Sequence, residues 1–199
     1  ITSLDDSGKL QIFSITKNQI ILQETNVSAF TWINTTSFPN PILAILENKK
    51  IKFISFTNHL AESVPFDITK RLAEFSIQKL NDNCSTICEF NLDFSFQSFI
   101  SFDSNSLLIL DDSDTLHHYL LFPDGLYSIK SESAKGCISF TYSGLYLAGQ
   151  SSNEIHLWTS NLNYICSTQA NGSHLCPISA NRFASINSSE KVANLITFN

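Results

Sequence analysis

The chain reads GLYLAGQSSNEIHLWTS from Gly144 to Ser160, and this stretch decides how the rest of the sequence is interpreted. Apolar and polar residues alternate on both sides of the small polar turn Ser151–Asn153, which is typical of two antiparallel strands joined as a hairpin. The same pattern occurs at residues 1–15, 42–56 and 107–121. One hairpin is too small to bury its own apolar face, so a unit that returns along the chain predicts stacked or radially arranged repeats.

The composition favours a single strand-rich globular domain over residues 1–199. Of these 199 residues, 43% are hydrophobic and 15% are charged, so the chain is long enough to bury about 70% of its unfolded surface. It contains 16 phenylalanines and no methionine. Aromatic and β-branched side chains fit a pleated, half-buried surface, and we expect an all-β fold. Without an initiator methionine, we expect the sequence to be part of a longer chain.

The alternation predicts strands along most of the chain, in units of about 40 residues that each hold about four strands. Outside the quoted hairpin, the expected strands cover residues 1–4, 10–15, 20–24, 27–33, 42–46, 51–56, 87–92, 96–102, 107–110, 116–122, 126–130, 137–142, 164–167, 175–179, 183–186 and 192–198. The first unit lacks an opening strand and the last unit lacks a fourth one. Residues 67–83 interrupt the pattern and fit two structures. Asp67 is a suitable N-cap for a short helical insertion, whereas Ala73, Phe75 and Ile77 alternate as in a strand.

Units of this size and strand number match the blades of a β-propeller. The best instance is Ile155–Thr159, because its aromatic residue Trp158 lies where the third strand of a WD-repeat blade ends in Trp-Asp. The chain therefore resembles the WD-repeat family. In the other units, the equivalent aromatic position is assigned to Phe13, Phe53 and Tyr119. None of these is followed by Asp, and no unit shows the family's Gly-His pair. The blades are therefore expected to be held mainly by apolar packing, without the family's buried Asp-His-Ser-Trp network.

The resemblance implies a scaffold that presents loops and rims to other proteins and has no catalytic activity. A seven-bladed ring needs roughly 280 residues, so the chain would supply about five blades of an incomplete or shared ring. The expected function is a non-enzymatic interaction subunit of a multi-protein intracellular complex. Such complexes include vesicle coats and tethers, and nuclear assemblies for ribosome production or transcription. The expected partners are other protein subunits, without a small-molecule substrate, and the expected location is cytoplasmic or nuclear.

The charge argues against a nucleic-acid surface. The net charge is -6, whereas affinity for phosphates comes mainly from clustered Lys and Arg. The dense basic group Lys49, Lys50 and Lys52 is interpreted as a solvated turn and strand start. No apolar run in the sequence reaches the length of about 18 residues that a membrane span needs, and we expect no cationic, apolar secretion leader. Direct contact with nucleic acid and a membrane span are therefore not expected.

Five scattered cysteines in a chain of this size favour free thiols and a reducing compartment. The chain also contains Asn-x-Ser/Thr triplets, which begin at Asn26, Asn34, Asn83, Asn171 and Asn187. In a sequence this rich in Ser and Thr, such triplets arise frequently by chance. They nevertheless define the competing interpretation, a secreted or cell-surface β-sandwich binding module that carries glycans.

Acidic clusters occur in two predicted hairpin turns. Asp111, Asp112 and Asp114 could serve acid-base chemistry or bind calcium. Short Asp and Ser side chains also bond their own backbone in turns, and this interpretation is preferred here and for Asp5 and Asp6.

A zinc site is the sharpest alternative chemistry. Cys166, His174 and Cys176 offer thiolate and imidazole ligands within a short span, but a fourth ligand is missing nearby. The pair Cys84 and Cys88 is too remote in sequence to be assumed as the partner. We therefore expect no metal site and no cofactor.

Nucleophilic catalysis by Cys137 with His117 or His118 has no third group that the spacing identifies. A sialidase-type propeller would need an arginine clamp, whereas Arg71 and Arg182 are the only arginines. No catalytic residue is therefore expected. The surface chemistry that remains is aromatic and aliphatic, which suits partner contacts, although Trp32 and Trp158 are expected in the core.

Overall fold

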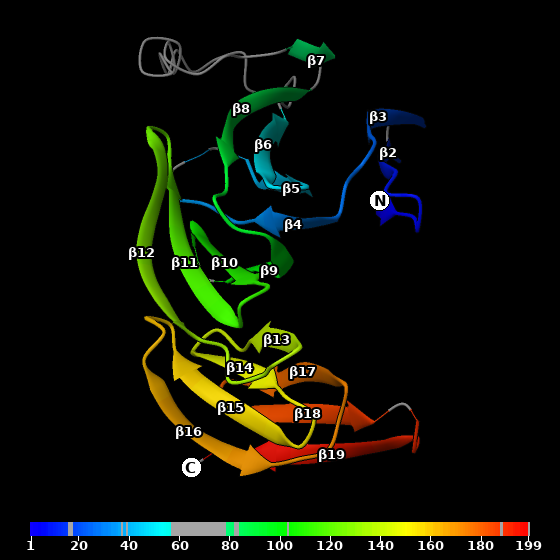
Figure 1. Ribbon diagram of the computed structural model, residues 1–199. Helices are drawn as coiled ribbons and strands as arrows, with labels where there is room; N and C mark the ends of the chain where they lie inside the picture. Colours follow the sequence, from blue (N-terminus) through cyan, green and yellow to red (C-terminus); the bar gives the residue numbers. More distant parts are fainter. Residues whose placement is uncertain are drawn as a thin grey trace.

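The computed structural model describes residues 1–15, 18–36, 38, 40–56, 79–81, 84–102, 104–187 and 189–198. All regular elements in these residues are β-strands, and they form five separate antiparallel sheets (Figure 1). With the strands given in spatial order, the first sheet contains β1 (Thr2–Leu4), β2 (Leu10–Ser14) and β3 (Gln19–Glu24), and the second contains β4 (Ala29–Ile33), β5 (Ile42–Glu47), β6 (Lys50–Phe56), β8 (Cys84–Asn91) and β7 (Lys79–Asn81). The third sheet contains β9 (Phe96–Ser101), β10 (Ser106–Asp111), β11 (Thr115–Phe122) and β12 (Gly125–Ser133), and the fourth contains β13 (Ser139–Tyr142), β14 (Tyr146–Gln150), β15 (Glu154–Thr159) and β16 (Tyr164–Gln169). The fifth sheet contains β17 (His174–Ser179), β18 (Arg182–Asn187) and β19 (Val192–Thr197).

These sheets follow one another as an arc of β-propeller blades (Figure 1). The predicted all-β fold of four-stranded antiparallel units is confirmed, including the missing opening strand of the first sheet and the missing fourth strand of the last. The alternative β-sandwich is wrong, because the strands in the described residues form five successive sheets and not two facing layers. Most of the predicted helical insertion at 67–83 lies outside the described residues, but Lys79–Asn81 within it forms the edge strand β7 and not a helix.

The core consists of one apolar cluster at each junction between successive sheets. Strand β5 shows how the sequence achieves this, because it is apolar at five consecutive positions and all five are fully buried. Ile42, Ala44 and Leu46 pack toward the third sheet, while Leu43 and Ile45 pack toward the first. A strand covered on both faces loses the apolar-polar alternation of a half-exposed strand. Each fully buried aliphatic side chain contributes about 1.5–3 kcal/mol.

A register step recurs in the first four sheets, between the third strand of each blade and its neighbour. The ladder shifts immediately before Phe13, Ile54, Tyr119 and Trp158. Such bulges bend a strand and increase its twist. Because the step lies at the same place each time, the units repeat in backbone geometry more faithfully than in amino-acid identity.

One hydrogen bond also recurs in these four sheets and closes each blade. A residue that follows β3, β8, β12 or β16 donates its backbone N–H to a carbonyl in the turn before the third strand of the blade. It follows its strand directly in three of the sheets and three residues later in the first. The pairs are Val27 to Gly8 at 2.9 Å, Leu92 to Lys49 at 2.6 Å, Ala134 to Asp114 at 2.8 Å and Ala170 to Asn153 at 3.0 Å. All four donor residues are buried, so the bond ties the end of each blade into the core.

The lysine group near residue 50 differs from its predicted solvated turn. Lys52 is only 8% exposed, and its Nζ lies 2.7 Å from Glu24 Oε1. The pair joins the second sheet to the first. Lys50 pairs with Glu89 on the neighbouring strand β8, so the basic group is largely neutralised by local carboxylates.

Candidate functional site

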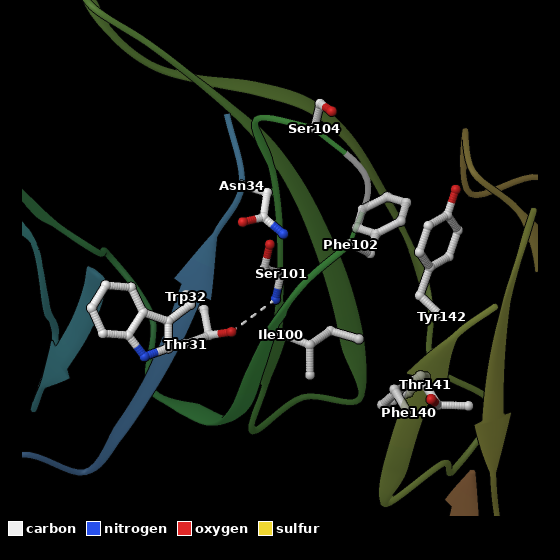
Figure 2. A pocket seen from close by; sticks show the side chains of 10 residues that line it. All are labelled: Thr31, Trp32, Asn34, Ile100, Ser101, Phe102, Ser104, Phe140, Thr141 and Tyr142. Carbon is white, nitrogen blue, oxygen red and sulfur yellow. Dashed lines mark hydrogen bonds between the residues drawn. The ribbon is translucent and has the colours of Figure 1, made fainter. Parts of the chain in front are cut away.

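A pocket of about 580 Å³ lies where the first strands of the second, third and fourth sheets meet (Figure 2). Strands β4, β9 and β13 are edge strands of their sheets, and each supplies one wall. The lining residues are Thr31, Trp32, Asn34, Ile100, Ser101, Phe102, Ser104, Phe140, Thr141 and Tyr142. Residues more than a hundred positions apart in sequence therefore face the same space.

The wall between β4 and β9 is fixed by hydrogen bonds around Asn105. Its backbone N–H donates to the Asn34 carbonyl at 3.1 Å, and its Oδ1 accepts from the Thr36 N–H at 3.2 Å. Asn105 is 8% exposed and has a φ of 63°, in the left-handed region that Asn tolerates better than most residues. Beside it, the Ser101 N–H donates to Thr31 Oγ1 at 3.3 Å (Figure 2). The first two walls are therefore joined before any ligand arrives.

The third wall is aromatic. Phe102 is 2% exposed, and its ring meets Tyr142 edge to face, with centroids 5.2 Å apart. The Tyr142 hydroxyl donates to the Gly144 carbonyl at 3.0 Å. A φ of 87° at Gly144 lies in the left-handed region that glycine adopts readily. The turn after β13 thus holds the Tyr142 ring at the pocket (Figure 2).

Trp32 forms the opposite side and differs from the expected core residue. It is 37% exposed, its Nε1 donates to Thr2 Oγ1 at 3.3 Å, and its ring packs 5.4 Å from Phe56. The indole is thus fixed against the first sheet and stays partly exposed. Trp158 is fully buried, as expected.

The pocket offers hydrogen bonds and apolar contact without strong acid-base groups. Its ten lining residues include no Asp, Glu, Lys, Arg, His or Cys. Hydroxyl and amide groups of Thr31, Asn34, Ser101 and Thr141 alternate with aromatic and aliphatic surface. This chemistry suits recognition of an uncharged group. Sequence reasoning missed the pocket, because neutral residues on three separate sheets carry no motif.

The predicted blade positions lie as follows. Trp158 packs between the third and fourth sheets, and Phe53 is fully buried between the second and third. Tyr119 packs against the same cluster as Phe53, while Phe13 is half-buried in the first sheet. In the ladder, Ile54 lies in line with Trp158, one residue after Phe53. The Trp158 Nε1 is buried and has no hydrogen-bond partner in the part of the chain that the structure describes.

The acidic turns follow the preferred interpretation. Asp111 Oδ1 accepts from the Ser113 N–H, the Ser113 hydroxyl and the Thr115 N–H at 2.8–2.9 Å. Asp5 Oδ1 accepts in the same way from Ser7 and Lys9. Burial raises the pKa of Asp111, but its hydrogen bonds outweigh burial and the net pKa is lowered. Both carboxylates therefore cap a turn.

Asp111 also takes part in a contact that the sequence did not reveal. Its Oδ2 lies 2.8 Å from His117 Nε2, and His117 Nδ1 lies 3.0 Å from Ser131 Oγ. The imidazole stacks on Phe94 with centroids 4.2 Å apart. His117 and Ser131 are direct cross-strand partners on β11 and β12. This series of contacts braces the outer part of the third sheet, on strands other than those that line the pocket.

The cysteine and histidine candidates do not converge. The described residues contain no group of three or more His, Cys, Asp or Glu side chains placed to hold a metal ion. Cys166 packs at the junction of the fourth and fifth sheets, whereas Cys176 is exposed. All five cysteines are free. Burial raises the pKa of the Cys88 and Cys137 thiols to about 12, which makes both poor nucleophiles.

Comparison with known proteins identifies the fold. No family model and no curated protein matches the chain. In contrast, 478 chains of solved structures match it. One is a chain of the crystal structure of the Mitotic Checkpoint Complex, with a TM-score of 0.61 and 9% sequence identity. The fold is that of a WD-repeat-like β-propeller.

The match covers 97% of this chain and 56% of the other, so the chain spans little more than half the length of its structural neighbour. At such low identity the likeness concerns the fold alone. Across the described residues, no helix has the length and apolar character required to cross a membrane.

Proposed function

We propose that the chain is a non-enzymatic protein-protein interaction scaffold, acting as one subunit of a multi-protein intracellular complex. The propeller fold supports this role, since WD-repeat-like propellers generally present rims and loops to partners. The structural neighbour belongs to a structure of the Mitotic Checkpoint Complex. For this chain, we propose a cytoplasmic or nuclear assembly, either a vesicle coat or tether or a complex for ribosome production or transcription.

An exposed apolar group on the β11–β12 hairpin carries the proposal. Phe122, Tyr127 and Ile129 are 37%, 46% and 52% exposed. The Phe122 and Tyr127 rings contact each other at 5.9 Å, and the Tyr127 hydroxyl donates to Asp124 Oδ2 at 3.0 Å. Aromatic side chains on a rigid hairpin are typical anchors of protein interfaces, because little conformational entropy is lost when they are buried.

Affinity purification of the full-length protein at mild salt, followed by mass spectrometry and light scattering, tests this function. We expect stoichiometric protein companions and an assembly larger than the single chain. Replacing both anchors, Phe122→Ser with Tyr127→Ser, should deplete companions that dock on the hairpin. Recovery of the wild-type protein alone and monomeric would contradict the proposal, and a mass loss on glycosidase treatment would favour secretion.

A further inference from the structure

We propose that the pocket between β4, β9 and β13 binds an uncharged aromatic or aliphatic side chain from an extended segment of a partner protein. This inference rests on the proposed scaffold function and assigns one part of the surface to one class of ligand. The volume, charge, hydrogen-bonding groups and rigidity of the pocket carry it.

The pocket has the size of a ligand site. Its volume of about 580 Å³ lies within the range of about 300–1,000 Å³ that is usual for ligand pockets. This space accommodates a large side chain together with part of its own backbone. Aromatic residues bury about 150–250 Å² each, which makes them effective anchors in such a space.

The lining selects against charge. None of its ten residues is acidic or basic. A carboxylate or ammonium group that entered the pocket would lose hydration without gaining a counter-charge, and this cost disfavours charged anchors. An aromatic or aliphatic side chain loses nothing comparable, and it gains contact with Ile100 and Phe140.

The polar groups suit a peptide backbone. Thr31 on β4, Ser101 on β9 and Thr141 on β13 place hydroxyl groups on all three walls, and Asn34 adds an amide (Figure 2). Hydroxyl and amide groups can both donate and accept hydrogen bonds, as the N–H and C=O groups of a main chain require. A partner segment that crosses the pocket would thus find its backbone partners beside its anchor.

The walls are ordered in the free protein. The Asn105 hydrogen bonds join the segment after β4 to the segment after β9, and the Tyr142 hydroxyl is fixed by Gly144. Trp32 is held by its bond to Thr2. Because these groups need little rearrangement, less free energy is lost on binding. Preorganised aromatic walls around an accessible space are characteristic of binding hot spots.

The first experiment uses saturation-transfer NMR on the full-length protein with N-acetyl-phenylalaninamide, N-acetyl-leucinamide and N-acetyl-lysinamide as probes. We expect signals from the two neutral probes and a much weaker signal from the lysine derivative. Ser101→Arg fills the pocket from β9 with a charged chain and should reduce the neutral signals about tenfold. The matched control Ser167→Arg places the same change on the exposed outer strand β16 and should leave them unchanged.

The second experiment compares the companions of the two variants after affinity purification. Loss of a companion from Ser101→Arg, but not from Ser167→Arg, supports the inference. If Ser101→Arg keeps every companion but loses the neutral probes, the pocket serves a free small molecule and the inference is overturned, while the scaffold function stands. If wild type has no companion, the proposed function itself fails.

Circular dichroism and thermal unfolding confirm that the variants remain folded. Should Ser101→Arg unfold, Thr141→Arg blocks the same space from β13. Equal binding of charged and neutral probes, or neutral-probe signals that a folded blocking variant does not reduce, would also overturn the inference.

Discussion

At the scale of single residues, the side chain of Gln150 provides a buried network of hydrogen bonds that connects neighbouring strands. It is fully buried, and its Nε2 donates to the carbonyls of Ser151, Glu154 and Ala170 at 2.7–3.1 Å. Its Oε1 accepts from the Ser185 hydroxyl at 2.6 Å. One side chain therefore joins the strands of the fourth sheet to the fifth, and every polar atom of its amide has a partner.

Replacing this side chain should be costly. Gln150→Leu keeps a similar volume but leaves the Ser185 hydroxyl and several carbonyls without the amide. A buried polar group left without a hydrogen bond costs about 1–3 kcal/mol. Because several such groups are affected, we expect the free energy of unfolding to fall by about 1 kcal/mol or more. Urea denaturation measures it. Gln169→Leu is the matched control, because Gln169 is exposed and its side chain donates to Glu154 Oε1, which is also near the surface, so the change should stay within about 0.5 kcal/mol. Equal losses in both variants would contradict this role.

Gly172 is constrained by the hydrogen bond between Ser185 and Gln150, which is called the bridge below. A Cβ built on Gly172 would lie 2.1 Å from Ser185 Oγ and 3.2 Å from the Ile186 carbonyl oxygen. Gly172→Ala must therefore displace the Ser185 hydroxyl from Gln150, and we expect a loss of about 1–3 kcal/mol in unfolding free energy. Gly125→Ala meets only ordinary contacts with Tyr127 and serves as the control. If Gly172→Ala is as stable as Gly125→Ala, the bridge contributes little.

At the scale of elements, the turn between β10 and β11 combines a cap with a charge. Asp111 accepts three hydrogen bonds on Oδ1 and contacts His117 on Oδ2. The equivalent turn of the first sheet repeats the cap with Asp5 and Ser7. Five residues lie between Leu110 and its ladder partner Leu116, as in the turn of the first sheet, whereas four lie between Leu46 and its partner Ile51 in the second sheet. The carboxylate thus stabilises the longer form of the turn.

This turn should make stability depend on pH. Because hydrogen bonds lower the pKa of Asp111 in the folded state, its contribution is present above the unfolded value of about 3.9 and is lost as the pH falls through the lower folded value. Asp111→Asn should therefore destabilise the protein by about 1–2 kcal/mol near pH 7, and by less at a pH below the folded pKa. Urea titrations at both pH values measure this difference, with the exposed Asp112→Asn as control. A penalty that stays constant with pH would contradict the role of the charge.

The elements were largely predictable from sequence, whereas their alignment between blades was not. The polar turn Ser151–Asn153 located its hairpin in the sequence, although four consecutive residues of each flanking strand, β14 and β15, are buried. In β6 the run around Phe53 and Ile54 is apolar on both faces, so no alternation marks the register, and the ladder places Ile54 in line with Trp158. The pocket could not be predicted from the sequence for a related reason, because its position depends on how separate sheets pack.

At the scale of the whole molecule, the chain is a series of sheets whose stability depends on the junctions between neighbours. Each junction carries one cysteine. Cys84 lies between the first and second sheets, Cys88 between the second and third, Cys137 between the third and fourth, and Cys166 packs at the edge of the last junction. Cys176 is exposed and free, and it supplies an internal reference. Thiol labelling therefore reports on each junction separately.

Under native conditions, we expect a maleimide to label Cys176 first and Cys166 next. Cys84, Cys88 and Cys137 should stay protected, because they are at most 4% exposed and label only when their junctions open. Gln150→Leu loosens the junction between the fourth and fifth sheets, so it should accelerate labelling of Cys166 several-fold while the rate at Cys84 stays nearly unchanged. Peptide mass spectrometry over a labelling time course measures all five sites in one sample. Equal acceleration at Cys84 and Cys166 would mean that the junctions open together, and the description of the molecule as a series of nearest-neighbour contacts would then be wrong.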